Sequence, residues 1–223
     1  MRAYRVLVTD KPRRTQRERV GESSRRLAEA AIALIAEQGY TATTAQEIGL
    51  RAGYSRDMVR VRFGTKEALL DTILTSEYES RLDQPDDPSE SGLRRVLSRI
   101  DRMRRFAEED AQLLRAMLVL NFEAAQADDQ LRTRIRRWLD HVRGGMADAI
   151  RAGQSDTSIA AELDADVQAR EILSTAIGYA YFWIVDPDFD LHTELTGLAE
   201  RLEARLRSPA DPMPPRERRR GST

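Results

Sequence analysis

Residues 43–66, TTAQEIGLRAGYSRDMVRVRFGTK, contain two short helical patterns joined by a glycine turn. Thr44 is placed to cap the first helix, whose apolar residues recur four positions apart on one face. Gly53 supplies a residue that readily adopts a left-handed bend, and Ser55 is placed to cap the second helix. Two caps and one glycine in this order predict a helix-turn-helix.

The second of these helices combines a narrow apolar side with a basic outer face. Val59 and Phe63 lie four residues apart and share the apolar side, whereas three arginines and Met58 point elsewhere. Arginine forms paired hydrogen bonds with guanine, so this pattern predicts a helix that enters the major groove of DNA. The candidate DNA-binding residues are Arg56 and Met58 for bases, Thr44, Arg60, Arg62 and Lys66 for phosphates, and the cap Ser55 beside them.

Charge is distributed unevenly along the chain. Residues 1–66 hold fourteen Lys and Arg against seven Asp and Glu, a net charge of +7, while the whole chain carries -1. The remainder is therefore acidic, with a net charge of -8. A basic end on an acidic body is typical of a protein that places one end on phosphates. The alternative, a helix corner in an all-helical enzyme or scaffold, does not account for this asymmetry.

The same segment resembles the TetR-type transcriptional repressors. Their pattern runs roughly T-x-x-x-I-A-x-x-A-G-V-S-x-x-T-L-Y-x-H-F-x-x-K-E-x-L, and this chain follows it over residues 44–69. The preceding stretch LAEAAIALIAEQGY resembles the first helix of the family, so the resemblance covers about residues 22–70. Gly49 stands where the family usually has alanine, Arg60 where it has a phosphate-contacting tyrosine, and Arg62 where it has histidine. Operator preference therefore does not carry over.

The resemblance implies an all-α protein with an N-terminal three-helix helix-turn-helix head and a C-terminal helical regulatory and dimerisation domain. We expect a disordered basic arm over residues 1–20, and a first helix that starts near Ser23. The DNA-binding domain should span residues 21–82. An acidic, proline-bearing loop, DQPDDPSE, separates it from the regulatory domain over residues 89–207. A disordered tail is expected over residues 208–223.

The regulatory half has helical spacing of apolar residues and no sustained alternation. The resemblance implies that the last two long helices pair with a second copy in a homodimer. The apolar segment around Gly178 agrees with this, although a core helix of the monomer would show the same pattern. The candidate interface residues are Ile177, Gly178, Tyr181, Leu195, Leu198 and Leu202.

The resemblance also implies a small-molecule effector inside the regulatory domain. Aromatic and methionine side chains suit a largely apolar pocket, although each of them is also common in a plain core. The candidate ligand-binding residues are Phe106, Met117, Phe122, Trp138, Met146, Tyr179, Phe182 and Trp183. The expected protein is a repressor that leaves a palindromic DNA operator when the effector binds. A DNA-binding protein without an effector is the alternative.

Other classes of protein find little support in the sequence. The absence of cysteine excludes disulfides and thiolate metal sites, and we expect no metal and no cofactor. His141 and His192 lie in helical patterns without any recognisable catalytic motif, so the chain is not expected to be an enzyme. The most apolar stretch, residues 172–185, is shorter than the roughly 20 residues that span a bilayer. We expect a cytoplasmic protein with no membrane contact.

Overall fold

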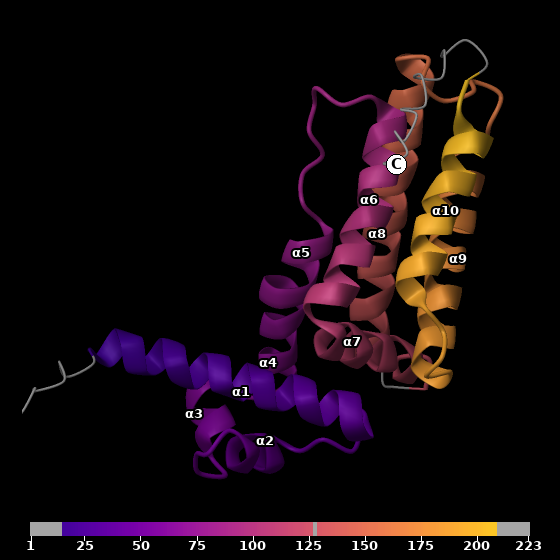
Figure 1. Ribbon diagram of the computed structural model, residues 1–223. Coiled ribbons are helices and arrows are strands. Elements are labelled where there is room, and N and C mark those ends of the chain that lie inside the picture. Colours follow the sequence, from indigo (N-terminus) through magenta and orange to yellow (C-terminus); the bar gives the residue numbers. More distant parts are fainter. Residues whose placement is uncertain (1–14, 127–128, 209–223) are drawn as a thin grey trace, which may run out of the picture.

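The computed structural model describes residues 15–126 and 129–208, and these residues form helices joined by short loops (Figure 1). Within those ranges the β-structure is one isolated bridge between Ile159 and Arg207. The predicted all-α fold is confirmed. None of the helices in this part of the chain combines the length and the apolar character needed to cross a membrane.

Three helices form the N-terminal head: α1 (Gln16–Gln38), α2 (Ala45–Arg51) and α3 (Met58–Phe63). Helix α1 starts earlier than expected because Thr15 and Glu18 form a capping box. The backbone amide of Thr15 donates to Glu18 Oε2 at 2.7 Å, and the amide of Glu18 donates to Thr15 Oγ1 at 3.3 Å. The predicted disorder is therefore wrong for residues 16–20, and the rest of the predicted arm, residues 1–14, lies outside the described residues.

A continuous helical rod leads from the head toward the C-terminal half. It consists of α4 (Lys66–Ile73), the π-helical segment η1 (Leu74–Glu79) and α5 (Ser80–Leu82). Thr65 caps α4 as expected, since its hydroxyl accepts from the Ala68 amide at 3.1 Å. The predicted loop at residues 83–90 then connects α5 to the next helix.

Five helices form the body: α6 (Gly92–Glu109), α7 (Ala111–Glu123), α8 (Asp129–Ser155), α9 (Ala165–Val185) and α10 (Leu191–Leu206). Helices α6, α8, α9 and α10 run side by side, and α7 crosses below them (Figure 1). Helix α6 packs against both α8 and α10, and α9 packs against α8. Residue 208 closes the described part, where its amide donates to the Ser158 carbonyl at 3.2 Å, and the remainder of the predicted tail, residues 209–223, lies outside it.

The apolar core continues from the head into the body. Helix α1 lies along α7, so its inward residues Leu27, Ala31 and Ile35 belong to the same buried cluster as the core of the body. Burial of apolar surface is worth about 25 cal/mol per Å². The shared core therefore docks the head on α7 in addition to the covalent link through α4.

Candidate nucleic-acid interface

The turn between α2 and α3 brings the two helices very close together. Gly53 has φ +79°, which confirms the predicted left-handed bend. A Cβ atom on Gly49 would lie 2.4 Å from the carbonyl oxygen of Ser55. This approach explains why glycine stands where the family usually has alanine. The fully buried side chains of Ile48 and Val59 fix the two helices against the core of the head.

The two predicted helix caps differ in their outcome. Thr44 caps α2 in a full capping box, in which its amide donates to Glu47 Oε2 at 2.9 Å and its hydroxyl accepts from the Glu47 amide at 3.2 Å. Ser55 does not cap α3, because the helix begins at Met58 with Asp57 at the cap position and no side-chain capping bond. Ser55 instead offers its carbonyl oxygen to the amide of Met58, at 3.1 Å.

Helix α3 exposes a different set of side chains from the one expected for base contact. Arg56 is exposed as predicted, whereas Met58 is half-buried and packs against the core. Val61 is 65% exposed and was missed. It lies two residues from the buried Val59, and therefore on the opposite side of the helix, a spacing that was visible in the sequence. The corrected base-facing candidates are Arg56 and Val61.

The two arginines expected at phosphates have unequal freedom. Arg60 and Asp57 are each 74% exposed and their nearest charged atoms are 3.8 Å apart, a pair too exposed to hold the guanidinium firmly. Arg62 is half-buried, and its Nε is enclosed without a hydrogen-bond partner in the described part of the chain. Arg60 is therefore the freer of the two to move toward a phosphate.

Lys66 is engaged within the protein and does not present a free ammonium group. Its Nζ donates to the carbonyl oxygens of Tyr40 at 3.0 Å and Thr43 at 2.8 Å, and lies 3.9 Å from the centre of the Tyr40 ring. Burial lowers the pKa of this ammonium group. The predicted phosphate anchor is thus corrected to a side chain that ties α4 to the loop between α1 and α2.

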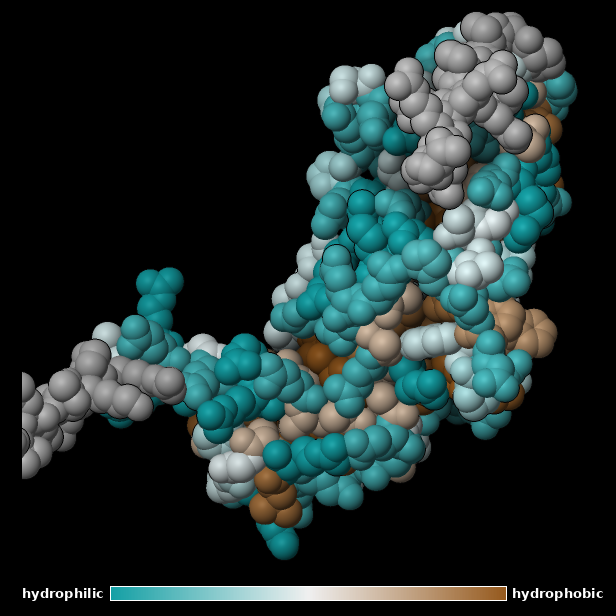
Figure 2. All heavy atoms as spheres, in the orientation of Figure 1, coloured by the Kyte–Doolittle hydropathy of each residue, from teal (hydrophilic) through white to brown (hydrophobic). Residues whose placement is uncertain are grey.

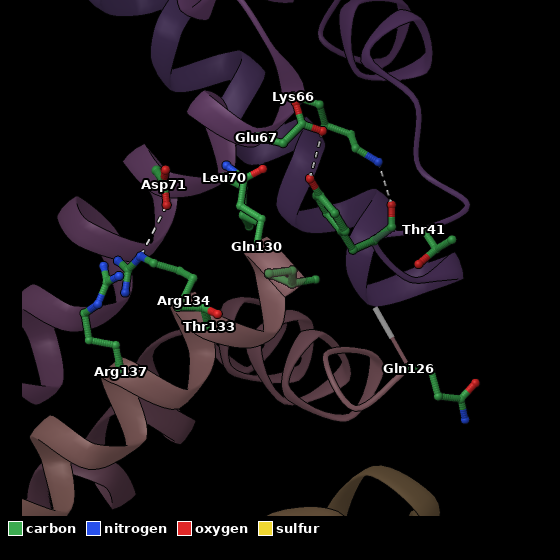
Figure 3. A pocket seen from close by; sticks show the side chains of 12 residues that line it. Thr41, Lys66, Glu67, Leu70, Asp71, Gln126, Gln130, Thr133, Arg134 and Arg137 are labelled. Carbon is green, nitrogen blue, oxygen red and sulfur yellow. Dashed lines mark hydrogen bonds and ion pairs between the residues drawn. The ribbon is translucent and has the colours of Figure 1, made fainter. Parts of the chain in front are cut away.

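A cavity of about 750 Å³ lies where the head meets the body. In Figure 3, Lys66 and Thr41 lie at one end of it, and Asp71, Arg134 and Arg137 lie at the other. The Nε of Arg134 donates to Asp71 Oδ1 at 3.2 Å across the cavity wall. The full lining is Tyr40, Thr41, Lys66, Glu67, Leu70, Asp71, Gln126, Gln130, Leu131, Thr133, Arg134 and Arg137. Most of these residues have polar or charged side chains, and the apolar parts of the same side chains also face the cavity.

The predicted ligand-binding residues do not gather around one cavity. None of the eight lines the cavity of about 750 Å³. Four are core residues, namely Phe106, Met117, Trp138 and Met146. Tyr179 and Trp183 are half-buried against the same core, and Phe122 and Phe182 are exposed. The set is wrong as a single pocket, because an aromatic residue in the sequence serves a core, a surface and a pocket equally well.

The predicted dimer residues also divide into two groups. Leu195, Leu198 and Leu202 are buried within the monomer, where α10 packs against α6, so placing them at a dimer interface was wrong. Tyr181 is 46% exposed. Ile177 and Gly178 are half-buried, and a Cβ atom on Gly178 would meet nothing within 4 Å. These three residues of α9 remain accessible to a partner.

Helix α9 carries an apolar surface that the monomer does not cover. We define the α9 face as Tyr181, Phe182 and Val185, with Phe122 of α7 beside it. The rings of Phe122 and Tyr181 lie edge to face with centroids 5.3 Å apart. By contrast, the face of the molecule seen in Figure 2 is predominantly hydrophilic. Exposed apolar groups that lie together mark interaction surfaces more often than scattered ones do.

Comparison with known proteins finds a family match in the N-terminal part of the chain. Residues 27–73 match the family model described as bacterial regulatory proteins, tetR family. The matched range contains α2, α3, α4 and most of α1. No curated protein matches the chain significantly.

Solved structures extend the similarity to the whole fold. The full-length TetR regulator TylP of Streptomyces fradiae is 25% identical, with a TM-score of 0.67 over 86% of this chain and 90% of that chain. SmeT of Stenotrophomonas maltophilia, the repressor of the SmeDEF multidrug efflux pump, is 19% identical, with a TM-score of 0.69 over 86% and 100%. The fatty acid degradation regulator FadR of Bacillus halodurans is 18% identical, with a TM-score of 0.65 over 83% and 97%.

Proposed function

We propose that this chain, whose N-terminal domain belongs to the TetR family of bacterial regulatory proteins, acts as a homodimeric repressor that binds a palindromic operator. A small-molecule effector bound to the body lowers its affinity for DNA. The observation that carries the proposal is the outer surface of α3. Arg60 and Val61 are exposed on α3 and Arg56 is exposed in the turn just before it, while Val59 anchors the helix on its buried side.

The chemistry of this surface suits the major groove. The guanidinium of Arg56 can donate two hydrogen bonds to the O6 and N7 of a guanine, and the methyl groups of Val61 can contact the methyl group of a thymine. Arg60 supplies charge for a phosphate. Ion pairs compensate other arginines of the head. Arg51, for example, donates to Glu37 at 2.8 and 2.5 Å, whereas no ion pair within 4 Å is formed by Arg56 among the described residues.

Dimerisation supplies the second half of the operator contact. The α9 face is the surface we propose for it, because its apolar side chains are exposed and Gly178 leaves space for another helix. Two copies of α3 would then enter successive major grooves about 34–36 Å apart, so the operator should be a palindrome.

The cavity between the head and the body is the site we favour for the effector. The eight residues expected to line an apolar pocket inside the body do not gather around one cavity, whereas the cavity of about 750 Å³ has the size of a ligand site and is lined mainly by residues with polar or charged side chains. A molecule bound there would touch both α4 of the head connection and α8 of the body. We therefore favour an effector with hydrogen-bonding groups over a purely apolar one.

Selection of bound sequences from a random pool of DNA duplexes tests the proposed function. We expect a single palindromic motif, and binding that weakens steeply with salt because each phosphate contact contributes about 0.9 to the slope of log K against log salt concentration. Arg56→Ala should relax the choice of base at one position of each half-site, at a cost of about 1–3 kcal/mol.

Two outcomes would contradict this function. If the purified dimer enriched no motif, the proposal that it is a sequence-specific regulator would be wrong. A motif whose affinity is unchanged by every small molecule that the protein binds would leave a DNA-binding protein without an effector, since coupling between effector and operator must be reciprocal.

A further inference from the structure

The corner between α1 and α2 is held by a carboxylate that comes from the body. Glu123, the last residue of α7, accepts hydrogen bonds at the same oxygen, Oε2, from the backbone amides of Tyr40 at 2.8 Å and Thr41 at 3.1 Å. The hydroxyl of Thr41 lies 3.5 Å from that oxygen. Glu123 lies more than 80 positions from the corner in sequence, so this contact depends on the docking of the head on the body.

The corner is shaped to receive this side chain. Gly39 has φ +85°, and a Cβ atom on it would lie 1.9 Å from Glu123 Oε1. Glycine is therefore required at this position twice, for its backbone conformation and for the space that the carboxylate fills. Among the described residues, Glu123 forms no ion pair within 4 Å. Its charge is met by backbone N–H groups, which form strong hydrogen bonds to a carboxylate.

Lys66 holds the same corner by binding the corner's backbone carbonyl groups. Its ammonium group binds the carbonyl oxygens of Tyr40 and Thr43, while Glu123 binds the amide groups of Tyr40 and Thr41. Figure 3 shows this part of the corner beside the cavity. The backbone bound by Glu123 and Lys66, residues 40–43, leads directly to Thr44, the cap of α2. Helix α2 in turn sets the position of α3 through the glycine turn.

We infer that Glu123 is a positioning residue for DNA binding, through which α7 of the body holds the corner and keeps α3 in its binding orientation. This inference rests on the proposed function, because it assumes that α3 reads DNA. Movement of α7 would withdraw the carboxylate from the Tyr40 and Thr41 amides. The corner would then become free to move, and only a fraction of molecules would present α3 correctly, which lowers the apparent affinity by that fraction.

Substitution of Glu123 in the full-length protein tests the inference. Glu123→Ala removes both hydrogen bonds and should weaken binding about tenfold, within the range typical of coupled sites. Glu123→Gln keeps an oxygen that can accept from both amides without the charge, and should weaken binding only about twofold to threefold. Glu109→Ala is the matched control, since Glu109 is an exposed acid at the end of α6. It should leave binding unchanged.

Two measurements separate positioning from general stability. The first is the affinity for the duplex that the wild-type protein selects from the random pool. The second is hydrogen exchange of the Tyr40 and Thr41 amides, which should speed up in Glu123→Ala while exchange in α6 and α8 stays the same. If Glu123 only stabilised the fold, Glu123→Ala would lower the melting temperature together with the affinity. A loss of affinity in Glu123→Ala that Glu123→Gln restores, with the same melting temperature in both variants, would instead indicate positioning.

Gly39→Ala provides an independent route to the same contact. Alone it should weaken DNA binding, because its Cβ displaces the carboxylate and its backbone is strained. Combined with Glu123→Ala, the two losses should be less than additive, since both remove one interaction. Full affinity in Glu123→Ala with faster exchange at Tyr40 and Thr41 would overturn the inference. Failure of the wild-type protein to select any duplex would instead overturn the proposed function.

Discussion

Helix α3 in the head fully buries one side chain, Val59, whereas α10 in the body buries five leucines along one face. The apolar stripe of α10 packs within the body, mainly against α6 and also against α9, while α3 leaves Arg60 and Val61 exposed to solvent. A helix that reads DNA must leave most of its side chains exposed so that they can contact bases and phosphates. Its position therefore depends on the turn before it and on the neighbouring helices more than on its own buried side chains. Substitutions in the core of the body should therefore act mainly on stability, and substitutions that move α3 should act on DNA binding.

The largest effect is expected in the core of the body. Leu195→Ala truncates a side chain with 0% exposure, and should reduce the free energy of unfolding by about 2–5 kcal/mol. Urea denaturation at two protein concentrations measures this loss and shows whether it depends on association. Thr196→Ala, at the exposed neighbouring position, is the control and should stay within about 0.5 kcal/mol of the wild type.

A different result for Leu195 would reverse the comparison. If Leu195→Ala dissociated the dimer and left the monomer as stable as before, α10 would be an interface helix as the sequence predicted. The structure predicts the opposite, namely a less stable monomer whose association is unchanged.

The glycine turn should show the next largest effect. Gly49→Ala places a Cβ atom 2.4 Å from the Ser55 carbonyl, and a shift of α3 should cost about 1–3 kcal/mol. Thermal unfolding and binding to the selected duplex measure the two consequences. Gly21→Ala is the control, because a Cβ atom at this exposed position of α1 meets nothing within 4 Å. It should stabilise the helix by about 0.5–1 kcal/mol. Equal behaviour of the two variants would mean that the close approach at Gly49 is relieved without cost.

A smaller effect is expected at the α9 face. Tyr181→Ser removes an exposed ring and should weaken association by about 1–2 kcal/mol, with no loss of monomer stability. Sedimentation across a range of concentrations measures it. Val61→Ala, which truncates an even more exposed apolar residue on α3, should leave the dimer unchanged. A dimer that persists in Tyr181→Ser at every concentration would locate the interface elsewhere.

Features of the head that depend on neighbouring residues could be predicted from the sequence. The Thr44 cap and the Gly53 bend were predicted correctly because each depends on residues within a few positions along the chain. Ser55 and Met58 were misassigned because α3 begins only at Met58, a boundary that local patterns leave uncertain. Helix caps and turns depend on neighbouring residues, and the Thr44 cap and the Gly53 turn were enough to predict a helix-turn-helix.

Contacts that depend on tertiary packing were not visible in the sequence. The leucines of α10 show only that this helix has an apolar partner, and the same spacing serves α6 or a second copy. In the sequence, Glu123 looks like an ordinary surface charge and Lys66 like a phosphate contact. Their contacts with the corner join segments 83 and 26 positions apart, for Glu123 and Lys66 respectively. The connection between head and body therefore had to come from the structure.

The smallest expected effect concerns salt dependence, and it tests the corrected role of Lys66. Arg60→Ala should remove a phosphate contact and flatten the slope of log K against log salt concentration by about 0.9. Lys66→Met should leave that slope unchanged, because the ammonium group already binds the carbonyls of Tyr40 and Thr43. The same substitution should lower the melting temperature, since those carbonyls lose their donor. If Lys66→Met flattened the slope as much as Arg60→Ala, the ammonium group would have to leave the corner when DNA binds. In the complex the corner would then be held by Glu123 alone, so the orientation of α3 would depend more strongly on the position of α7 in the body.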